Sequence, residues 1–285
     1  MKCLYTNTDC LPNKLNEIEP FLVNNDIKIA AFVETIPKNC VFEEHKNLTF
    51  NLDGFNCLSN NNGRGVCVYI NNTFEIIERY NNYEDIFSPS IFCKIKPSTI
   101  SDDMFTLGVI YRSPNSSHIE NDRLNKLIKS VASKFQKSGE KLILLGDFNF
   151  PDICWLTESS DKPQHSDSNT FLNTIHECYL TQFIKQPTHF RAQQTPTLID
   201  LILSNDPDFI SNIDYNPPFG KSHHCVITFD IDVYTAKGKS NPVFKYLYNK
   251  GDYDAMREYA RQVKWNEVLV EGDSIDQQWS KIESV

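Results

Sequence analysis

Hydrophobic residues along the chain fall into short runs that are separated by polar turns. Many of these runs are rich in β-branched and aromatic residues, a composition typical of β-strands. The predicted strands are Lys2–Thr6, Ile27–Val33, Gly65–Ile70, Phe74–Glu78, Ser90–Ile95, Phe105–Tyr111, Lys141–Leu145, Leu198–Leu203 and Cys225–Ile231.

Longer segments show helical spacing instead. The predicted helices are Pro12–Val23, Glu120–Gln136 and Ser168–Glu177. In the second of these, Leu124, Leu127, Ile128 and Val131 recur at three- and four-residue spacing, which places them on one helix face. Hairpin-like strands mixed with a few helices predict an α/β fold of two packed mixed sheets flanked by helices.

The pattern changes near the C-terminus. Residues 1–235 carry the predicted sheets, whereas Ala236–Asn241 is polar, contains glycine and resembles a linker. An amphipathic segment, Asp252–Val268, follows, with Tyr253, Met256, Ala260 and Val263 on one side. We therefore expect one domain over residues 1–235, with residues 236–285 forming a linker and a helical segment. The asparagine pairs at Asn71–Asn72 and Asn81–Asn82 and the run Asn60–Asn62 are interpreted as turns.

Composition indicates the cellular compartment of the protein. Its 285 residues are 40% hydrophobic, enough for a substantial core, but the N-terminus lacks an apolar signal segment and no window could span a membrane. The nine cysteines are scattered and none forms a Cys-x-x-Cys pair, which favours free thiols over a zinc ribbon. We expect an intracellular protein in a reducing compartment, nuclear or cytoplasmic, with no membrane partner.

The formal net charge of -9 disfavours simple electrostatic adhesion to nucleic acid. An acidic protein can still act on phosphates when a divalent metal bridges its carboxylates to the substrate. Charge alone leaves both options open.

Polar side chains gather where the predicted strands end. They are Asn7, Asp9, Glu34, Tyr111, Arg112, Asp147, Asn149, Asp200, His223 and His224. Each one alone fits a structural role equally well, as a turn cap or a solvated strand end. Together they fit a site, because strand ends bring side chains from a rigid scaffold to one mouth.

These residues lie in motifs that resemble the endonuclease/exonuclease/phosphatase superfamily. The motifs are "YTNTD", "FVETI", "VIYRSPN", "LLGDFNFPDI", "TPTLIDLIL" and "GKSHHCVITFDI", in that order. The likeness is narrower to the apurinic-endonuclease-like domain of non-LTR retrotransposon polyproteins. It implies a four-layer α/β/β/α sandwich and a metal-dependent endonuclease. It also implies DNA as substrate, with element RNA as a further partner through a reverse transcriptase expected after the C-terminal segment.

Hydrolysis of a phosphodiester assigns roles to these positions. Glu34, with Asp9, is the expected Mg²⁺ ligand, because hard carboxylates suit this ion. Asp147 would orient or deprotonate water, and Asn149 would hold the phosphate or Asp147 itself by hydrogen bonds. Because they lie two apart in extended chain, both would face the cleft while Phe148 anchors the loop. His224, fixed by Asp200, would contact a phosphate oxygen.

The remaining site residues have supporting roles. Asn7 and Tyr111 are further catalytic contacts to phosphate or metal-bound water. Ser222 and His223 are assigned to substrate binding, and Arg112 pairs with a DNA phosphate or forms a surface salt bridge.

One position departs from the family pattern. The superfamily has Ser-Asp-His where this chain has Ser222-His223-His224. An imidazole in place of a carboxylate is expected to weaken Mg²⁺ and favour Mn²⁺. A tolerated variant, a changed metal preference and an inactive copy all remain open.

Two other functions are considered. A decayed or domesticated DNA-binding scaffold is supported by His223, although the other motif positions are filled. A phosphatase of the same fold acting on inositol lipids would need a cluster of basic residues beside the motifs, which the sequence lacks.

The resemblance also implies a biological role. The domain would nick chromosomal DNA and leave a 3′ hydroxyl that primes reverse transcription. Loops around the cleft would set target preference through DNA shape, and Ser113–Asn121 and Ser204–Asn212 are the two that we expect.

Overall fold

The computed structural model describes residues 1–38, 50–97, 103–233, 252–270 and 272–284. Contacts divide the chain into two units, residues 1–238 and 239–285. The predicted linker Ala236–Asn241 lies outside the described residues. Within the described residues, no helix is long and apolar enough to cross a membrane.

Two six-stranded sheets form the first unit. The first sheet has the order β13 (Ile210–Asn216), β14 (Val226–Ile231), β1 (Lys2–Asn7), β2 (Ile29–Val33), β4 (Val66–Asn71) and β3 (Phe55–Asn60). The second has the order β11 (Thr181–Gln182), β12 (Asp200–Ser204), β8 (Lys141–Asp147), β7 (Phe105–Tyr111), β6 (Ser90–Lys96) and β5 (Glu75–Arg79). Both are mixed, because β1 and β2 are parallel, β7 and β8 are parallel, and the other pairs are antiparallel.

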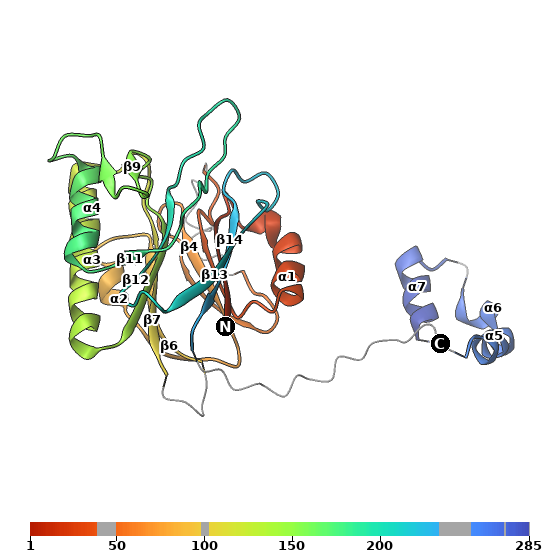
Figure 1. The fold of residues 1–285 in the computed structure, drawn as a ribbon. Helices are drawn as coiled ribbons and strands as arrows, with labels where there is room; N and C mark the ends of the chain where they lie inside the picture. The colour runs from red at the N-terminus through yellow and green to blue at the C-terminus, as the bar shows by residue number, and fades with distance from the viewer. Residues whose placement is uncertain (39–49, 98–102, 234–251, 271, 285) are drawn as a thin grey trace. The chain divides into compact units, whose positions relative to one another are not determined.

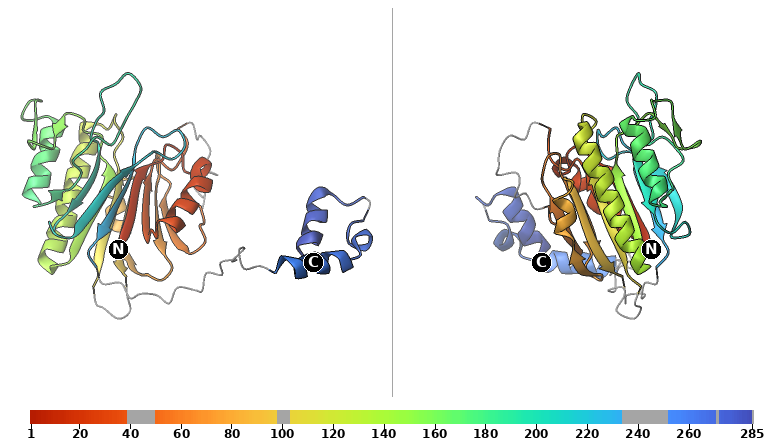
Figure 2. Two further views of the ribbon diagram at one scale, coloured as in Figure 1. Left: turned by 45° about the vertical axis from the view of Figure 1, so that its right-hand side comes forward. Right: turned by 90° about the vertical axis from the view of Figure 1, so that its left-hand side faces the viewer.

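Helices cover the outer faces of both sheets (Figure 1). The first sheet is covered by η1 (Pro12–Lys14) and α1 (Leu15–Asn24). The second is covered by α2 (Asn81–Glu84), α3 (His118–Ser138) and α4 (Asp167–Glu177), the last two lying side by side in Figure 2. A small ribbon of β9 (Ile153–Cys154) and β10 (Ser159–Ser160) lies near α4. The predicted α/β/β/α sandwich is confirmed.

Three apolar clusters correspond to the three layer boundaries. The largest lies between the sheets and includes Tyr5, Val68, Leu107 and Leu145. On the outer side of the second sheet, the predicted helical stripe of α3 is buried: Leu124, Leu127, Ile128 and Val131 have no exposed surface. Ser117 and Glu120 form a capping box that begins this helix, and Gly139, with φ 69°, ends it.

Gly146, in the "LLGDFN" motif, is required by a close backbone approach. A Cβ atom at this position would lie 2.3 Å from the carbonyl oxygen of Ile110 on the parallel neighbour β7. A side chain there would push apart the two strands that end at Tyr111 and Asp147. Glycine therefore fixes the spacing of these two residues.

Several predicted boundaries are wrong. The strands β3 and β13 were not predicted, because Asn and Ser interrupt their apolar pattern, and the predicted turn at Asn81–Asn82 opens α2. Of the two predicted target loops, Ser113–Asn121 runs into the first turn of α3. Ser204–Asn212 ends inside β13 and follows the far end of β12, away from Asp200.

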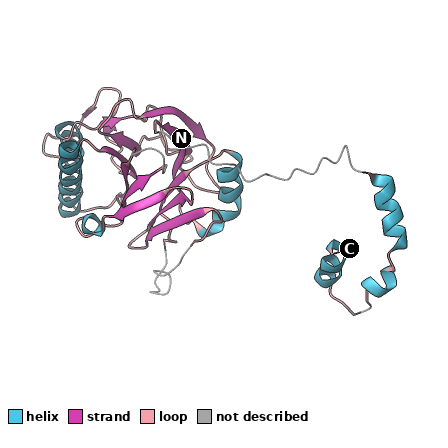
Figure 3. Ribbon diagram, turned by 90° about the horizontal axis from the view of Figure 1, so that it is seen from below, coloured by secondary structure: helices cyan, strands magenta, loops and turns pink. Residues whose placement is uncertain are grey.

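The second unit contains α5 (Tyr253–Gln262), α6 (Trp265–Val268) and α7 (Ile275–Glu283) (Figure 3). The predicted amphipathic segment is thus divided between two helices, because Val263 has extended backbone with ψ 127°. The aromatic and aliphatic side chains of Met256, Tyr259 and Trp265 line a shallow apolar pocket within this unit.

Candidate active site

The candidate site lies where the inner strands of both sheets end. In the first sheet, Asn7 pairs with Val33, the residue before Glu34. In the second, Asp147 pairs with Tyr111 on one side and with Asp200 on the other. Strand register therefore brings these residues together from distant parts of the sequence, as predicted from their positions at strand ends.

Asp147 is buried, with an exposed fraction of 1%. Its Oδ2 accepts a hydrogen bond from Asn7 Nδ2 at 2.9 Å, and its Oδ1 accepts one from the backbone N–H of Asn149 at 3.1 Å. Burial and the nearby charge of Asp200 raise the pKa of Asp147. The carboxylate is consequently a stronger base than an exposed aspartate.

His224 and Asp200 form a buried pair. His224 Nδ1 lies 2.7 Å from Asp200 Oδ2, and its Nε2 lies 3.9 Å from Asp147 Oδ2. Asp200 also accepts hydrogen bonds from Tyr5 at 2.9 Å and from Thr188 at 2.7 Å. Burial lowers the pKa of His224, but the charge and hydrogen bond of Asp200 outweigh it and raise the pKa to about 9.

The pKa of Asp200 shifts in the opposite direction from that of His224. Burial favours its neutral acid, but the charge of His224, together with the hydrogen bonds from His224, Thr188 and Tyr5, outweighs burial and lowers the pKa of Asp200. At neutral pH the pair is therefore an imidazolium beside a carboxylate. Nδ1 then donates to Asp200, which leaves the Nε2–H beside Asp147.

Glu34 is held from two sides. The hydroxyl of Tyr111 donates to its Oε1 at 2.6 Å, and Arg64 Nη2 donates to its Oε2 at 2.5 Å. The same Arg64 nitrogen donates to Asp9 Oδ1 at 2.6 Å. Burial and the charge of Glu34 raise the pKa of Tyr111, so its phenol remains a hydrogen-bond donor.

Three residues of the site have left-handed backbone. The φ angles are 40° at Asp9, 51° at Glu34 and 51° at Asn149. Such conformations cost roughly 1–3 kcal/mol each in a residue other than glycine, and they persist only where surrounding contacts hold them. Here they turn the side chains at the points where β1, β2 and β8 end.

Asn149 contradicts the predicted geometry. Because its φ is 51°, Asp147 and Asn149 are not two residues of one extended strand that face the same cleft. The side-chain amide of Asn149 donates to the carbonyl of Arg112 at 2.8 Å, and its backbone N–H holds Asp147. The predicted anchor, Phe148, is fully buried.

Arg112 is also placed differently from the prediction. Its side chain is buried, its Nε donates to Asn121 at 2.7 Å and its Nη1 to the carbonyl of Asn149 at 2.8 Å. The guanidinium lies 4.0 Å from the ring centre of Phe150. The buried guanidinium therefore supports the loop after β8. This position contradicts the prediction that Arg112 lies at the surface and pairs with a DNA phosphate or with a surface carboxylate.

The Ser222–His224 triplet has divided roles. Ser222 is buried, donates to the carbonyl of Asn7 at 2.7 Å and accepts from the backbone N–H of His224 at 3.3 Å. Its hydroxyl therefore links β1 to His224, and the predicted substrate contact is wrong. His223 is exposed, with its ring 6.1 Å from that of His189.

The sequence analysis did not identify Tyr5, Thr188 and Arg64. Tyr5 lies within an apolar strand and Thr188 within an irregular segment, so neither stands at a predicted strand end. Arg64 lies in the turn between β3 and β4. This turn was not predicted, because β3 was not predicted. The single arginine in "NNNGRGV" was the available signal.

Two clusters of side chains contain the residue types that bind metals. Ligand atoms of Asp147, Asp200 and His224 lie within 4.8 Å of one another. Both oxygens of Asp200 already accept hydrogen bonds, however, and His224 is protonated at neutral pH.

Asp9 and Glu34 fit a divalent ion better. Their oxygens converge on one cationic nitrogen, that of Arg64. Burial opposes ionisation of Asp9, but Lys38 and Arg64 lower its pKa overall. Two carboxylates that converge on one cation are a suitable donor set for Mg²⁺.

Residues 105–228 match the family model described as endonuclease-reverse transcriptase. The matched segment contains Tyr111, Asp147, Asn149, Asp200 and the Ser222–His224 triplet, but begins after Asn7, Asp9 and Glu34. No curated protein matches the chain.

Solved structures extend the likeness over the whole first unit. The endonuclease domain of TRAS1, a telomere-specific non-LTR retrotransposon, is 16% identical with a TM-score of 0.62, and the match covers 82% of this chain and 99% of that one. The chain has the endonuclease/exonuclease/phosphatase fold. The resemblance predicted from the motifs is confirmed.

Other structures with this fold act on different phosphate esters. The Neisseria 3′ phosphatase NExo, bound to a product DNA hairpin, is 16% identical with a TM-score of 0.55, covering 82% of this chain and all 100% of that one. A mannosyl-6-phosphatase from Bacteroides thetaiotaomicron is 11% identical with a TM-score of 0.55 and the same coverage. The endonuclease/exonuclease/phosphatase fold thus includes nucleases and phosphatases.

The placement of Arg112 generates a stability prediction. Replacing Arg112 with Ala leaves the buried Asn121 side chain and the carbonyl of Asn149 without their donor, and should lower the free energy of unfolding by about 2 kcal/mol or more. Urea unfolding measures this change. The exposed Arg123→Ala variant is the control and should unfold within about 0.5 kcal/mol of the wild type. Equal stability of both variants would contradict the buried role.

The His224–Asp200 pair generates a pH prediction. In the metal-free protein, the imidazole of His224 should keep its proton through neutral pH and lose it near the pKa of about 9. In an Asp200→Asn variant, burial remains while the main raising charge is removed, so the pKa of His224 should fall by several units. NMR titration of the imidazole nitrogens follows both. The pair stabilises the fold most below the unfolded pKa of about 6.5, and this stabilisation is lost as the pH rises towards 9. An unchanged pKa in Asp200→Asn would exclude this pairing.

Proposed function

We propose that the domain is a divalent-metal-dependent DNA endonuclease that nicks target DNA and leaves a 3′ hydroxyl for target-primed reverse transcription. The observation that carries the proposal is the convergence of three features at one mouth: the buried base Asp147, the His224–Asp200 pair and the carboxylate of Glu34. Phosphodiester hydrolysis needs a base, a cationic hydrogen-bond donor and a metal ligand. The likeness to the TRAS1 endonuclease domain supports the retrotransposon context.

Glu34 would hold the metal, with Asp9 as a second ligand. When bound, Mg²⁺ would polarise the phosphate and stabilise negative charge on the leaving oxygen. Tyr111 would orient Glu34, since its hydroxyl donates to Oε1 at 2.6 Å.

Asp147 would act as the general base. Its two oxygens are oriented by Asn7 and by the backbone N–H of Asn149, so the remaining lone pairs have fixed directions. Because burial and Asp200 raise its pKa, Asp147 would take a proton from the attacking water more readily than an exposed aspartate would.

His224 would bind the phosphate. Its Nδ1–H is committed to Asp200, and its protonated Nε2 is available for a non-bridging phosphate oxygen. The positive charge would offset the negative charge that accumulates on that oxygen during attack. Asp200 has a positioning role, as do Tyr5 and Thr188, which donate to it.

His223 affects the choice of metal. It stands where the superfamily has a carboxylate, so the site has one hard ligand fewer. Mn²⁺ accepts imidazole nitrogen more readily than Mg²⁺ does. We propose Mg²⁺ as the metal, with Mn²⁺ supporting equal or higher activity.

DNA would lie across the mouth formed by these strand ends. The connection between β11 and β12 projects at this end of the sandwich (Figure 1) and replaces Ser204–Asn212 as the candidate for target preference. The residues Ser113–Ser117 between β7 and α3 remain the second candidate.

A decayed DNA-binding scaffold is the second candidate function, and His223 is the observation that favours it. Such a scaffold would bind DNA without cutting it. A phosphatase of the same fold would release inorganic phosphate and leave a plasmid intact.

A plasmid assay separates these functions. The purified chain should relax supercoiled plasmid in Mg²⁺ or Mn²⁺ but not in EDTA. Asp147→Asn and His224→Gln should each lower the rate by about 10²-fold or more, because each removes a group that acts on the reacting atoms. Asp208→Asn is the matched control, since this exposed carboxylate lies beyond the far end of β12.

Extension of the nicked product by a DNA polymerase would identify the 3′ hydroxyl. His223→Asp should raise the Mg²⁺-supported rate relative to the Mn²⁺-supported rate. Cleavage that survives Asp147→Asn would refute the site assignment. A folded wild type that cuts no plasmid in either metal would favour the scaffold.

A further inference from the structure

Arg64 occupies the position that a metal ion would need. One of its terminal nitrogens, Nη2, lies 2.6 Å from Asp9 Oδ1 and 2.5 Å from Glu34 Oε2. Its other terminal nitrogen, Nη1, donates to the carbonyl of Ile36 at 2.5 Å. The guanidinium therefore bridges the two carboxylates that the proposed function assigns to the metal.

The bridge has a clear electrostatic cause. Asp9 and Glu34 come from two parallel strands that end side by side, and their left-handed backbone turns both carboxylates to one place. Two carboxylates close enough to contact the same nitrogen atom repel each other unless a cation lies between them. In the metal-free protein Arg64 supplies the charge, and a hydrogen bond to Glu34 helps to offset the burial of its side chain.

A metal that bridges Asp9 Oδ1 and Glu34 Oε2 would need the place between them that Arg64 Nη2 now fills. Mg²⁺ binds its oxygen ligands at about 2.0–2.1 Å, so an ion in this place would lie too close to the guanidinium nitrogen. Metal binding to these two oxygens would therefore displace Arg64. The Nε atom of Arg64 is buried and makes no hydrogen bond within the described residues, so it adds little to the anchoring of this position.

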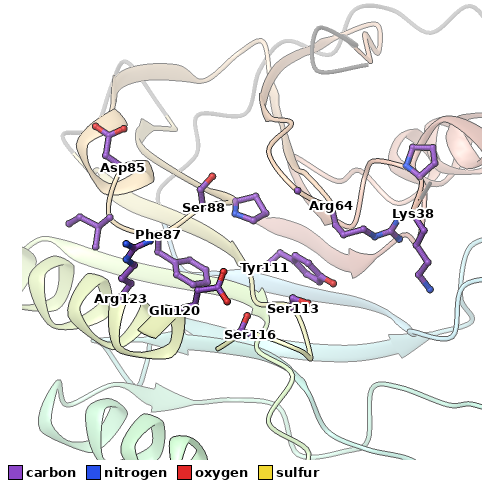
Figure 4. A pocket seen from close by; sticks show the side chains of 14 residues that line it. Lys38, Arg64, Asp85, Phe87, Ser88, Tyr111, Ser113, Ser116, Glu120 and Arg123 are labelled. Carbon is purple, nitrogen blue, oxygen red and sulfur yellow. The ribbon is translucent and has the colours of Figure 1, made fainter. Parts of the chain in front are cut away.

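A cavity beside the bridge can receive the displaced side chain. Arg64 lines a pocket of about 540 Å³ together with Lys38, Tyr111, Ser113 and Arg123. In Figure 4, Arg64 and Lys38 lie on one side of this pocket and Arg123 on the other, with Tyr111 between them. The lining also includes the acidic Asp85 and Glu120. The basic side chains Lys38, Arg64 and Arg123 outnumber them and, with the hydroxyls, can hold an anionic ligand.

We propose that Arg64 is a displaceable counter-ion of the metal site. It holds Asp9 and Glu34 in the metal-free protein, leaves them when a divalent ion binds, and then takes a phosphate of the nucleic-acid strand as its new partner. The inference rests on the proposed function, because it needs the metal at Asp9 and Glu34.

Metal and DNA then bind cooperatively. The metal must displace Arg64, and the guanidinium then loses both of its carboxylate partners. A phosphate in the pocket compensates for that loss, so DNA should raise the affinity for metal and metal should raise the affinity for DNA by the same factor. Metal would therefore bind more weakly in the absence of substrate than in its presence.

The test measures metal binding rather than cleavage. Mn²⁺ is titrated into the full chain, and the free ion is followed by electron paramagnetic resonance. Arg64→Gln keeps a polar side chain of similar reach but removes the charge, and Arg64→Ala is the second variant. Lys38→Gln is the matched control, since its Nζ lies 3.8 Å from Asp9 Oδ1 and its side chain is 70% exposed.

If Arg64 is bonded in at least nine of ten metal-free molecules, its removal should tighten Mn²⁺ binding by about tenfold or more. Lys38→Gln removes the same charge without opening the site and should change the affinity by less than about threefold. Adding a duplex with cleavage-resistant phosphorothioate linkages should tighten Mn²⁺ binding to the wild type several-fold more than to Arg64→Gln, in which only the contact between metal and phosphate couples the two ligands.

The outcomes separate the two proposals. Equal Mn²⁺ affinity in wild type and both Arg64 variants would overturn the role of Arg64 while leaving the metal site in place. Weaker binding in a variant that keeps the wild-type circular dichroism spectrum would overturn it too. Failure of every form to bind Mn²⁺ would refute the metal site and the counter-ion together.

Discussion

Repulsion among buried carboxylates is the constraint on which the site depends. Asp9, Glu34, Asp147 and Asp200 lie around one mouth, and two of them have an exposed fraction of 1%. Three of them are offset by a cationic neighbour: Arg64 for Asp9 and Glu34, and His224 for Asp200. Among the described residues, Asp147 accepts hydrogen bonds only from the neutral Asn7 and Asn149, and burial together with the charge of Asp200 raises its pKa. A site balanced in this way is ready to accept a further cation.

The scaffold makes this arrangement possible by fixing backbone positions. Two parallel strand pairs, β1 with β2 and β7 with β8, end at the same mouth, so residues from four strands meet there. Gly146 allows β7 and β8 to approach closely, and the buried Arg112 holds the loop that follows. Much of the polar network therefore serves to place Asp147 rather than to contact substrate.

The strand-end rule predicted most of the site from the sequence. It identified Asn7, Glu34, Tyr111 and Asp147, because polar residues at the ends of buried strands are visible in the pattern. Asp200 was predicted instead from its place inside the motif "TPTLIDLIL". It could not reveal left-handed backbone, and so it misplaced the side chain of Asn149. It also took Arg112 for a surface residue, since an arginine after a strand gives no sign that a helix and an aromatic ring will cover it.

Residues inside strands or irregular segments were harder to identify. Tyr5 belongs to the apolar pattern of β1, and only the structure places its hydroxyl on Asp200. Arg64 depends on a hairpin whose first strand, β3, has interrupted periodicity. The layers of the fold were predictable because apolar spacing determines them, whereas register between the two sheets was not, because it depends on contacts distant in sequence.

The central claim is that Asp9 and Glu34 form a cation site that Arg64 fills in the absence of metal. A crystal of the protein soaked in Mn²⁺, with diffraction recorded at the manganese absorption edge, locates the ion directly. The account predicts an anomalous peak between Asp9 and Glu34, with the guanidinium of Arg64 moved off both carboxylates. A peak among Asp147, Asp200 and His224, with Arg64 still bridging Asp9 and Glu34, would contradict it.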